Sequence, residues 1–327
     1  MGEKAFRRMG ERLGLPIVIL AIGLGLSVSH AHFFTLDNLT NVLNQAALVA
    51  IVGFGMTAAI AGGGFDLSVG SVLALSACVG ANLVNSSTLA VSVAAALALS
   101  AGIGLINGLI ITRLRVPTFI ATLAMMAIVR GGVLLYTRGR DINIIVSGSK
   151  EAAYKFFGGG FFFSLPVPML IMLAVLIGFY VLLRHTALGR HICAVGSNEE
   201  AAVTSGLRVD RIKVVVFTLV GLTAGLASVI QTSQLMGVSG GTSGLGLELE
   251  AIAVTVLGGT SLKGGRARLV GTLMGAILLA LARNGLNLHG TPHYYQYLVL
   301  GVILLLAVSL DGLRSKHLAA AGTWTGG

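Results

Sequence analysis

The chain is poor in charged side chains. Lys, Arg, Asp and Glu make up 10% of its 327 residues, against roughly 25% in an ordinary soluble domain. Hydrophobic residues make up 55% and fall in long aliphatic runs, and the mean hydropathy is +0.91. So few charges cannot cover a water-facing surface, which excludes a soluble globular enzyme and indicates one integral membrane domain.

Cysteine is equally scarce. Cys78 lies in an apolar run and Cys193 in a polar loop, so neither a disulfide framework nor a metal cluster is expected. No Ser/His/Asp set or paired carboxylates can be placed, and the glycine-rich segments match neither GxxxxGKS/T nor GxGxxG. We therefore expect no catalytic residue, no metal and no cofactor bound by this chain.

Ten apolar stretches predict an all-α, polytopic helical bundle with about ten transmembrane segments. They cover residues 15–33, 43–61, 67–83, 89–112, 117–136, 167–183, 214–234, 247–258, 269–282 and 297–310. The third, eighth, ninth and tenth are shorter than the roughly 20 residues of a straight span. We expect their ends to extend into the neighbouring glycine-rich or polar turns.

The basic residues predict the orientation. Threading the segments alternately, with the N-terminus inside, places most of the 22 Lys and Arg residues on the cytoplasmic side, and Arg130 and Arg283 outside or near the outer face. The chain then divides into a basic cytoplasmic N-terminus (1–14), one transmembrane domain (15–312) and a cytoplasmic C-terminal tail (313–327). Within the domain, loop 184–213 faces the cytoplasm and loop 137–166 faces outside.

Two glycine-rich segments interrupt the apolar pattern. In GGGFDLSVGS at 62–71, Asp66 either caps the next helix or lines a transport route. In LGGTSLKGGRARLVG at 257–271, two Gly pairs flank a polar turn, which predicts a broken helix. Glycine-interrupted hydrophobic segments in matching parts of two halves are typical of a transport pathway.

The long cytoplasmic loop contains a short helix-forming patch. Residues 198–205 predict about two helical turns, with Asn198 as N-cap, Glu199 and Glu200 in the first turn and Gly206 as the stop. The loop is either a solvated connector or an element that docks on a cytoplasmic partner, and composition favours neither.

These features resemble the permease subunit of bacterial monosaccharide ABC importers, and the chain looks closest to the ribose-type permease. The family's first signature is matched within GGFDLSVGS by Gly63, Gly64, Asp66, Ser68 and Gly70, and its second within LELEAIAVTVLGGTSLKGG by Gly258, Gly259 and Thr260. The resemblance covers about residues 40–312. It implies a permease that moves a ribose-like monosaccharide across the bacterial inner membrane and performs no chemistry itself.

The resemblance also implies partners: a second permease copy, cytoplasmic ATP-binding subunits, and a periplasmic or extracellular sugar-binding protein. In the family, the loop corresponding to AVGSNEEAAVTSGL contacts the ATP-hydrolysing subunit. The residues on that pattern are Gly196, Asn198, Glu199, Glu200, Ala201, Ala202 and Gly206. We expect the Ala202 side chain to pack into a groove of that partner.

A sugar needs hydrogen-bonding groups along its path. The scarce intramembrane candidates are Gln45, Asn82, Asn107, Gln231 and Gln234, and each serves equally well as an interhelical hydrogen-bond partner. The main rival is an ion-gradient-driven secondary transporter, which usually needs several embedded carboxylates, whereas Asp66 is nearly alone. An ABC permease for a nucleoside or a signalling molecule stays an alternative.

Overall fold

The computed structural model describes the backbone of residues 2–292 and 294–322 and the side chains of 14–292 and 294–309. The side chains of the predicted basic N-terminus before residue 14 and of the predicted tail 313–327 therefore lie outside the described part. Residues 1, 293 and 323–327 lie outside it altogether.

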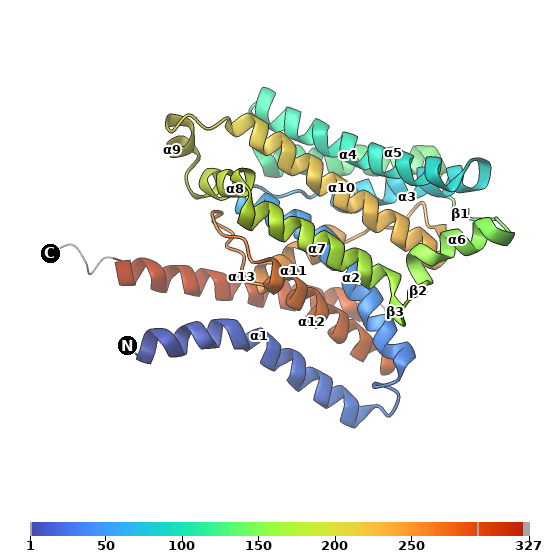
Figure 1. Cartoon of the computed structure of the whole chain (residues 1–327), viewed down its shortest axis with the longest axis horizontal. Coiled ribbons are helices and arrows are strands. Elements are labelled where there is room, and N and C mark those ends of the chain that lie inside the picture. Colours follow the sequence, from blue (N-terminus) through green and yellow to red (C-terminus); the bar gives the residue numbers. More distant parts are fainter. Residues whose placement is uncertain (1, 293, 323–327) are drawn as a thin grey trace.

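The chain folds as an all-α bundle, as predicted (Figure 1). The helices are α1 Gly2–Ser29, α2 Leu36–Ala61, α3 Val69–Ser86, α4 Leu89–Arg113, α5 Thr118–Thr137, α6 Gly148–Gly159, α7 Val167–His185, α8 Ala187–Ser197, α9 Glu199–Thr204, α10 Val209–Leu235, α11 Leu247–Leu257, α12 Leu269–Leu288 and α13 Tyr294–Gly322. Four short strands form two antiparallel pairs: β1 Ile142–Asn143 with β4 Gly237–Val238, and β2 Phe161–Phe162 with β3 Leu165–Pro166.

Seven helices of the described chain are long and apolar enough to cross a membrane: α2, α3, α4, α5, α7, α10 and α12. The apolar parts of α1 and α13 are shorter, at Gly14–Ser29 and Tyr294–Ser309. Helix α11 has only 11 residues, about half of what a span requires. The chain is thus a multi-pass membrane protein, but helix length alone does not confirm the predicted count of ten.

The connecting elements gather at two opposite ends of the bundle. Figure 1 shows α8, α9, the first turns of α1 and the last turns of α13 at one end, and α6 with the β1–β3 strands at the other. The predicted loop 184–213 and the two ends of the chain therefore share one side, opposite the predicted outer loop 137–166. We call these the α9 end and the α6 end.

The hydropathy pattern does not predict α6 and α8, which lie in the two long loops. Both are short and contain no run of spanning length. Helix α6 is nevertheless tied to the bundle: Tyr154 is 1% exposed, and its hydroxyl lies 2.6 Å from Oγ1 of Thr232 on α10. Side-chain packing on a neighbour, which a hydropathy window cannot register, holds this helix.

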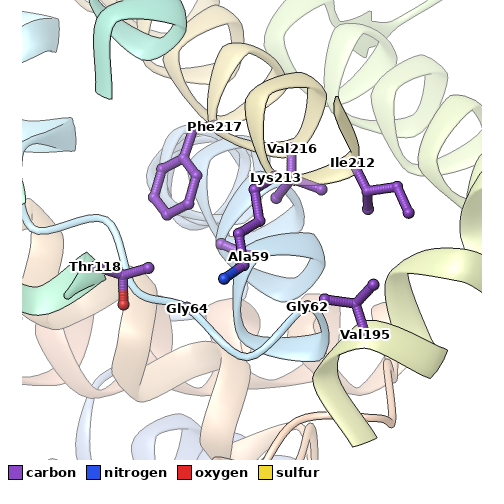
Figure 2. A pocket seen from close by; sticks show the side chains of 9 residues that line it. All are labelled: Ala59, Gly62, Gly64, Thr118, Val195, Ile212, Lys213, Val216 and Phe217. Carbon is purple, nitrogen blue, oxygen red and sulfur yellow. The ribbon is translucent and has the colours of Figure 1, made fainter. Parts of the chain in front are cut away.

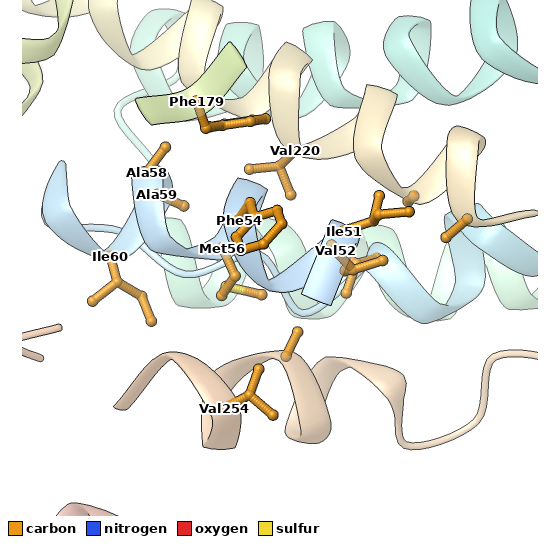
Figure 3. Packing of buried hydrophobic residues seen from close by; sticks show 14 of the residues in the cluster. Ile51, Val52, Phe54, Met56, Ala58, Ala59, Ile60, Phe179, Val220 and Val254 are labelled. Carbon is orange, nitrogen blue, oxygen red and sulfur yellow. The ribbon is translucent and has the colours of Figure 1, made fainter. Parts of the chain in front are cut away.

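Helix α2 is the centre of the bundle. Its residues 49–61 are all buried, and it packs against α7, α10, α11 and α12. Figure 3 shows Phe54 and its neighbours on α2 between Phe179 of α7, Val220 of α10 and Val254 of α11. Lipid is as apolar as these side chains, so close packing rather than a hydrophobic drive between helices holds them together.

Glycines spaced four residues apart join α4 to α10. Gly104 and Gly108 on α4 pack against Phe217 and Val214 of α10, and Gly221 and Gly225 on α10 pack against Ser100 of α4. A β-carbon at Gly104 would lie 3.0 Å from the carbonyl carbon of Phe217 and would overlap its oxygen. Small residues at this spacing allow helix backbones in a membrane to touch.

Polar side chains join α2 to α12. The amides of Asn38 and Asn284 donate to each other's oxygens at 3.1 and 2.6 Å, and the Thr57 and Thr272 hydroxyls lie 2.7 Å apart. The two hydroxyls also lie within hydrogen-bond distance of main-chain oxygens, Gly53 O and Arg268 O. The side-chain bonds between α2 and α12 add to these local bonds and fix the register of the two helices.

We predict that Gly104→Ala destabilises the folded chain by about 1–3 kcal/mol, because the added methyl group overpacks the α4–α10 contact. The matched control is Gly102→Ala on the same helix, where a β-carbon meets no atom within 4 Å. Thermal unfolding of the two purified variants in detergent measures the difference. Equal unfolding temperatures would show that the two helices are not in close contact.

Candidate functional site

Helices α8 and α9 form a corner at the α9 end. Asn198 is at once the C-cap of α8 and the N-cap of α9: its N–H donates to Ala194 O at 3.1 Å, and its Oδ1 accepts from the Ala201 N–H at 2.9 Å. Glu199 and Glu200 occupy the first turn of α9, as predicted. The predicted short helix and its cap are therefore present.

The two faces of α9 differ. Ala202 is 4% exposed and belongs to the chain's own core, whereas Val203 is 56% exposed. The expectation that Ala202 packs into a partner is therefore wrong, because its methyl group already packs inside this chain. Sequence spacing could not show which face of so short a helix is covered. The outward face carries Glu200, Ala201 and Val203.

Helix α9 is tied to α10 by an ion pair. Lys213 Nζ lies 2.6 Å from Glu199 Oε1. The Glu199 side chain is about half exposed, so the ion pair contributes only about 0–1 kcal/mol. Gly206 ends the turn after α9 with φ of +81°, a backbone region that a β-carbon disfavours.

A small hollow lies beside this corner, with a volume of about 10 Å³, roughly one water. Figure 2 shows Lys213, Val216 and Phe217 of α10 pointing towards the end of α2 and the turn Gly62–Gly64, with Val195 of α8 nearby. The hollow is too small for a sugar. It marks the place where α2, α5, α8 and α10 meet.

Both glycine-rich turns reach the last turn of α8. A β-carbon at Gly63 would lie 3.4 Å from Gly196 Cα, and one at Gly264 would lie 3.0 Å from the same atom. The Gly265 N–H donates to Ala61 O at 2.9 Å, which links the two turns directly. The predicted matching segments therefore meet each other, and they meet at a predicted coupling residue, Gly196.

Asp66 lies just beyond the first of these turns, in a non-helical stretch that leads into α3. Its carboxylate is 1% exposed and accepts from the Ser68 N–H at 2.9 Å, the Ser68 hydroxyl at 2.6 Å and the Asn107 amide at 3.4 Å. Asn107 also donates to Ser68 Oγ at 2.9 Å. The N-cap of α3 is Ser68, and no side chain makes a capping bond there, so the Asp66 carboxylate does not cap the helix but bonds to groups just before it and to α4. These bonds join three of the predicted residues, Asp66, Ser68 and Asn107.

The second half has two non-helical stretches, one at the predicted place and one that was not predicted. The break predicted at 257–271 is a turn between α11 and α12 that begins at Gly258 and Gly259, and Thr260 Oγ1 accepts from the Arg268 N–H at 3.1 Å. The second stretch precedes α11, at residues 239–246. It reaches Gly70 at the start of α3, where a β-carbon would lie 3.3 Å from the Gly244 carbonyl carbon.

A group of charged side chains around α11 was missed by sequence reasoning. Arg283 of α12 forms an ion pair with Glu250, which is 7% exposed. Arg130 of α5 donates to Ser243 O at 2.9 Å and stands in the field of Glu248. Arg130 belongs to α5 and Arg283 to α12. The sequence did contain a signal for this group, because Glu248 and Glu250 stand at the start of an apolar segment. Carboxylates at such a place need cationic partners.

The remaining pathway candidates are scattered. Asn82 donates to the Tyr136 hydroxyl at 2.8 Å, and Gln45 and Gln231 are half-buried on α2 and α10. Gln234 lines a hollow of about 320 Å³ at the α6 end together with Lys155 and Phe156.

Comparison with known proteins gives a consistent result. The family model described as "Branched-chain amino acid transport system / permease component" matches residues 38–308. The ribose import permease protein RbsC of Escherichia coli (strain K12) is 46% identical over 95% of this chain and 96% of its own length. RbsC of Bacillus subtilis (strain 168) is 41% identical over 96% and 95%.

A further relative is the L-arabinose ABC transporter permease protein AraH of Azospirillum brasilense, 36% identical over 94% of this chain and 89% of its own length. No solved structure matches the chain. The matches cover nearly the whole bundle, from the start of α2 into α13. The chain therefore belongs to this family of permease components, and it is a membrane transport subunit rather than an enzyme.

Proposed function

We propose that this chain is the permease subunit of an ATP-binding-cassette importer for ribose or a closely related monosaccharide. The observation that carries the proposal is the 46% identity to a ribose import permease over 95% of the chain. The arabinose relative supports the same substrate class, since both sugars are small neutral polyols. Such a solute needs hydrogen-bonding groups but no charge partner along its path.

The working complex in this proposal contains a second permease copy, two ATP-binding subunits and an extracytoplasmic sugar-binding protein. Helices α1, α11 and α13 add to the seven long helices, so that ten segments cross or enter the bilayer. The α9 end faces the cytoplasm, since the basic residues of the connecting loops gather there. The transmembrane domain then runs over 15–312, between cytoplasmic termini at 1–14 and 313–327, in the bacterial inner membrane.

In this mechanism the exposed face of α9 contacts the ATP-binding subunit. Closure of the two ATP-binding subunits displaces α9, and the helices around the two non-helical stretches alternate between inward and outward openings. No catalytic step, metal or cofactor is assigned to this chain, because ATP hydrolysis takes place on the partner.

We predict ATP-dependent uptake of radiolabelled ribose into proteoliposomes that contain the permease, its ATP-binding subunit and its binding protein. Excess unlabelled ribose should abolish the signal, and an ionophore that collapses ion gradients should leave it unchanged. Uptake by the permease alone, driven by a proton or sodium gradient, would instead establish the secondary transporter.

The orientation is tested by cysteine labelling. In a chain carrying Cys78→Ala and Cys193→Ser, we expect Glu200→Cys in intact cells to resist a membrane-impermeant maleimide, because α9 is cytoplasmic. Arg140→Cys at the α6 end is the matched control and should react. Labelling of position 200 from outside would reverse the orientation.

Docking through α9 is tested at its exposed apolar residue. Val203→Glu should leave the permease inserted and abundant, since Val203 is 56% exposed, but should lower co-purification of the ATP-binding subunit and sugar uptake on the order of ten-fold. Lys155→Gln, an exposed substitution at the α6 end, should change neither. Normal co-purification of the Val203→Glu variant would show that this face of α9 is not the contact.

A further inference from the structure

The last turn of α8 can move only together with α9. A single residue, Asn198, separates the two helices, and it caps both of them through its N–H and its Oδ1. The Ala202 N–H also donates to Asn198 O at 3.0 Å, and Ala202 anchors α9 on the core. The corner therefore has no flexible linker that could absorb a displacement of α9.

That turn touches both glycine-rich turns through main-chain atoms. A β-carbon at Gly196 would lie 2.9 Å from the Gly265 nitrogen and would overlap the Ala61 oxygen, and one at Gly264 would lie 3.0 Å from Gly196 Cα. Backbone packed on backbone leaves no side chain that can change rotamer to take up a shift. A displacement of Gly196 and Ser197 must therefore move both turns.

Each glycine-rich turn leads into a helix of the bundle, the first into α3 and the second into α12. Beyond Gly64, the chain runs through the hydrogen-bonded segment from Asp66 to Ser68 into α3. On the other side of the contact, the turn after Gly258 connects α11 to α12 and packs on Gly271. The two halves meet a second time, deeper in the bundle, where Gly70 touches Gly244.

We propose that Gly196 and Ser197 form the joint through which displacement of α9 reaches α3 and the α11–α12 pair at the same time. They are positioning residues, since they act through the turns and do not touch the sugar. The inference rests on the proposed function, because it takes α9 as the contact of the ATP-binding subunit.

Two neighbouring glycines allow a matched test. Gly264 and Gly265 have nearly the same positive φ, +80° and +78°, a region that a β-carbon disfavours at either position. The clashes differ, however. Alanine at 265 meets the side chain of Ser197, which can be removed, whereas alanine at 264 meets the main chain of Gly196, which cannot.

The experiment uses the full complex in proteoliposomes and measures co-purification of the ATP-binding subunit, ATP hydrolysis and sugar uptake. Gly265→Ala should keep co-purification and lower uptake per ATP on the order of ten-fold. Adding Ser197→Gly should restore a large part of that uptake. The same second substitution should not rescue Gly264→Ala.

Ser197→Gly alone removes only an exposed side chain, so this variant should fold normally. It should nevertheless lower uptake per ATP about three-fold, because the Ser197 side chain no longer contacts the turn at Gly265. Unchanged uptake per ATP in Ser197→Gly, or equal rescue of both alanine variants, would show that Gly196 and Ser197 do not form this joint. Loss of co-purification in Gly265→Ala would also overturn it, since the defect would then lie at the docking face. If the Val203→Glu variant still co-purifies with the ATP-binding subunit, the proposed docking role of α9 is wrong, and this outcome is distinct from those that test the joint.

Discussion

Direct contact between main chains is the constraint on which this fold depends. At Gly104 against Phe217, at Gly196 against Ala61 and at Gly70 against Gly244, a single added carbon would have no room. In lipid, where burial of apolar surface gives no net gain between helices, such contacts supply the dispersion energy that holds a bundle together. The glycines at these contacts are therefore a packing requirement and do not indicate disorder.

Hydrogen bonds and ion pairs between buried polar groups are the second constraint on the fold. Asp66, Glu250 and the Asn38–Asn284 pair are each satisfied by a partner on another helix or at a helix start. Because an unpaired charge at this depth costs several kcal/mol, each pair permits only one arrangement of its helices. Small residues allow the helices to pack closely, and the polar contacts then determine the register between them.

Much of this arrangement could be predicted from the sequence, and the exceptions share a cause. Capping signals are local, so the α9 helix and its Asn198 cap were predicted within a residue. Hydropathy located the seven long apolar helices but not α6 or α8, whose stability comes from packing on neighbours. The inward side of Ala202, the position of the irregular stretch before α11 and the partners of Arg130 and Arg283 all depend on tertiary contacts. No pattern within one segment encodes them.

The charged group around α11 has an electrical consequence. Glu250 and Arg283 form an ion pair, so one negative charge is balanced by one positive charge. A net charge carried across the bilayer exchanges about 2.3 kcal/mol with a potential of 100 mV, whereas a neutral pair moving as a unit exchanges almost none. A joint movement of α11 and α12 would therefore carry this pair without doing electrical work against the membrane voltage.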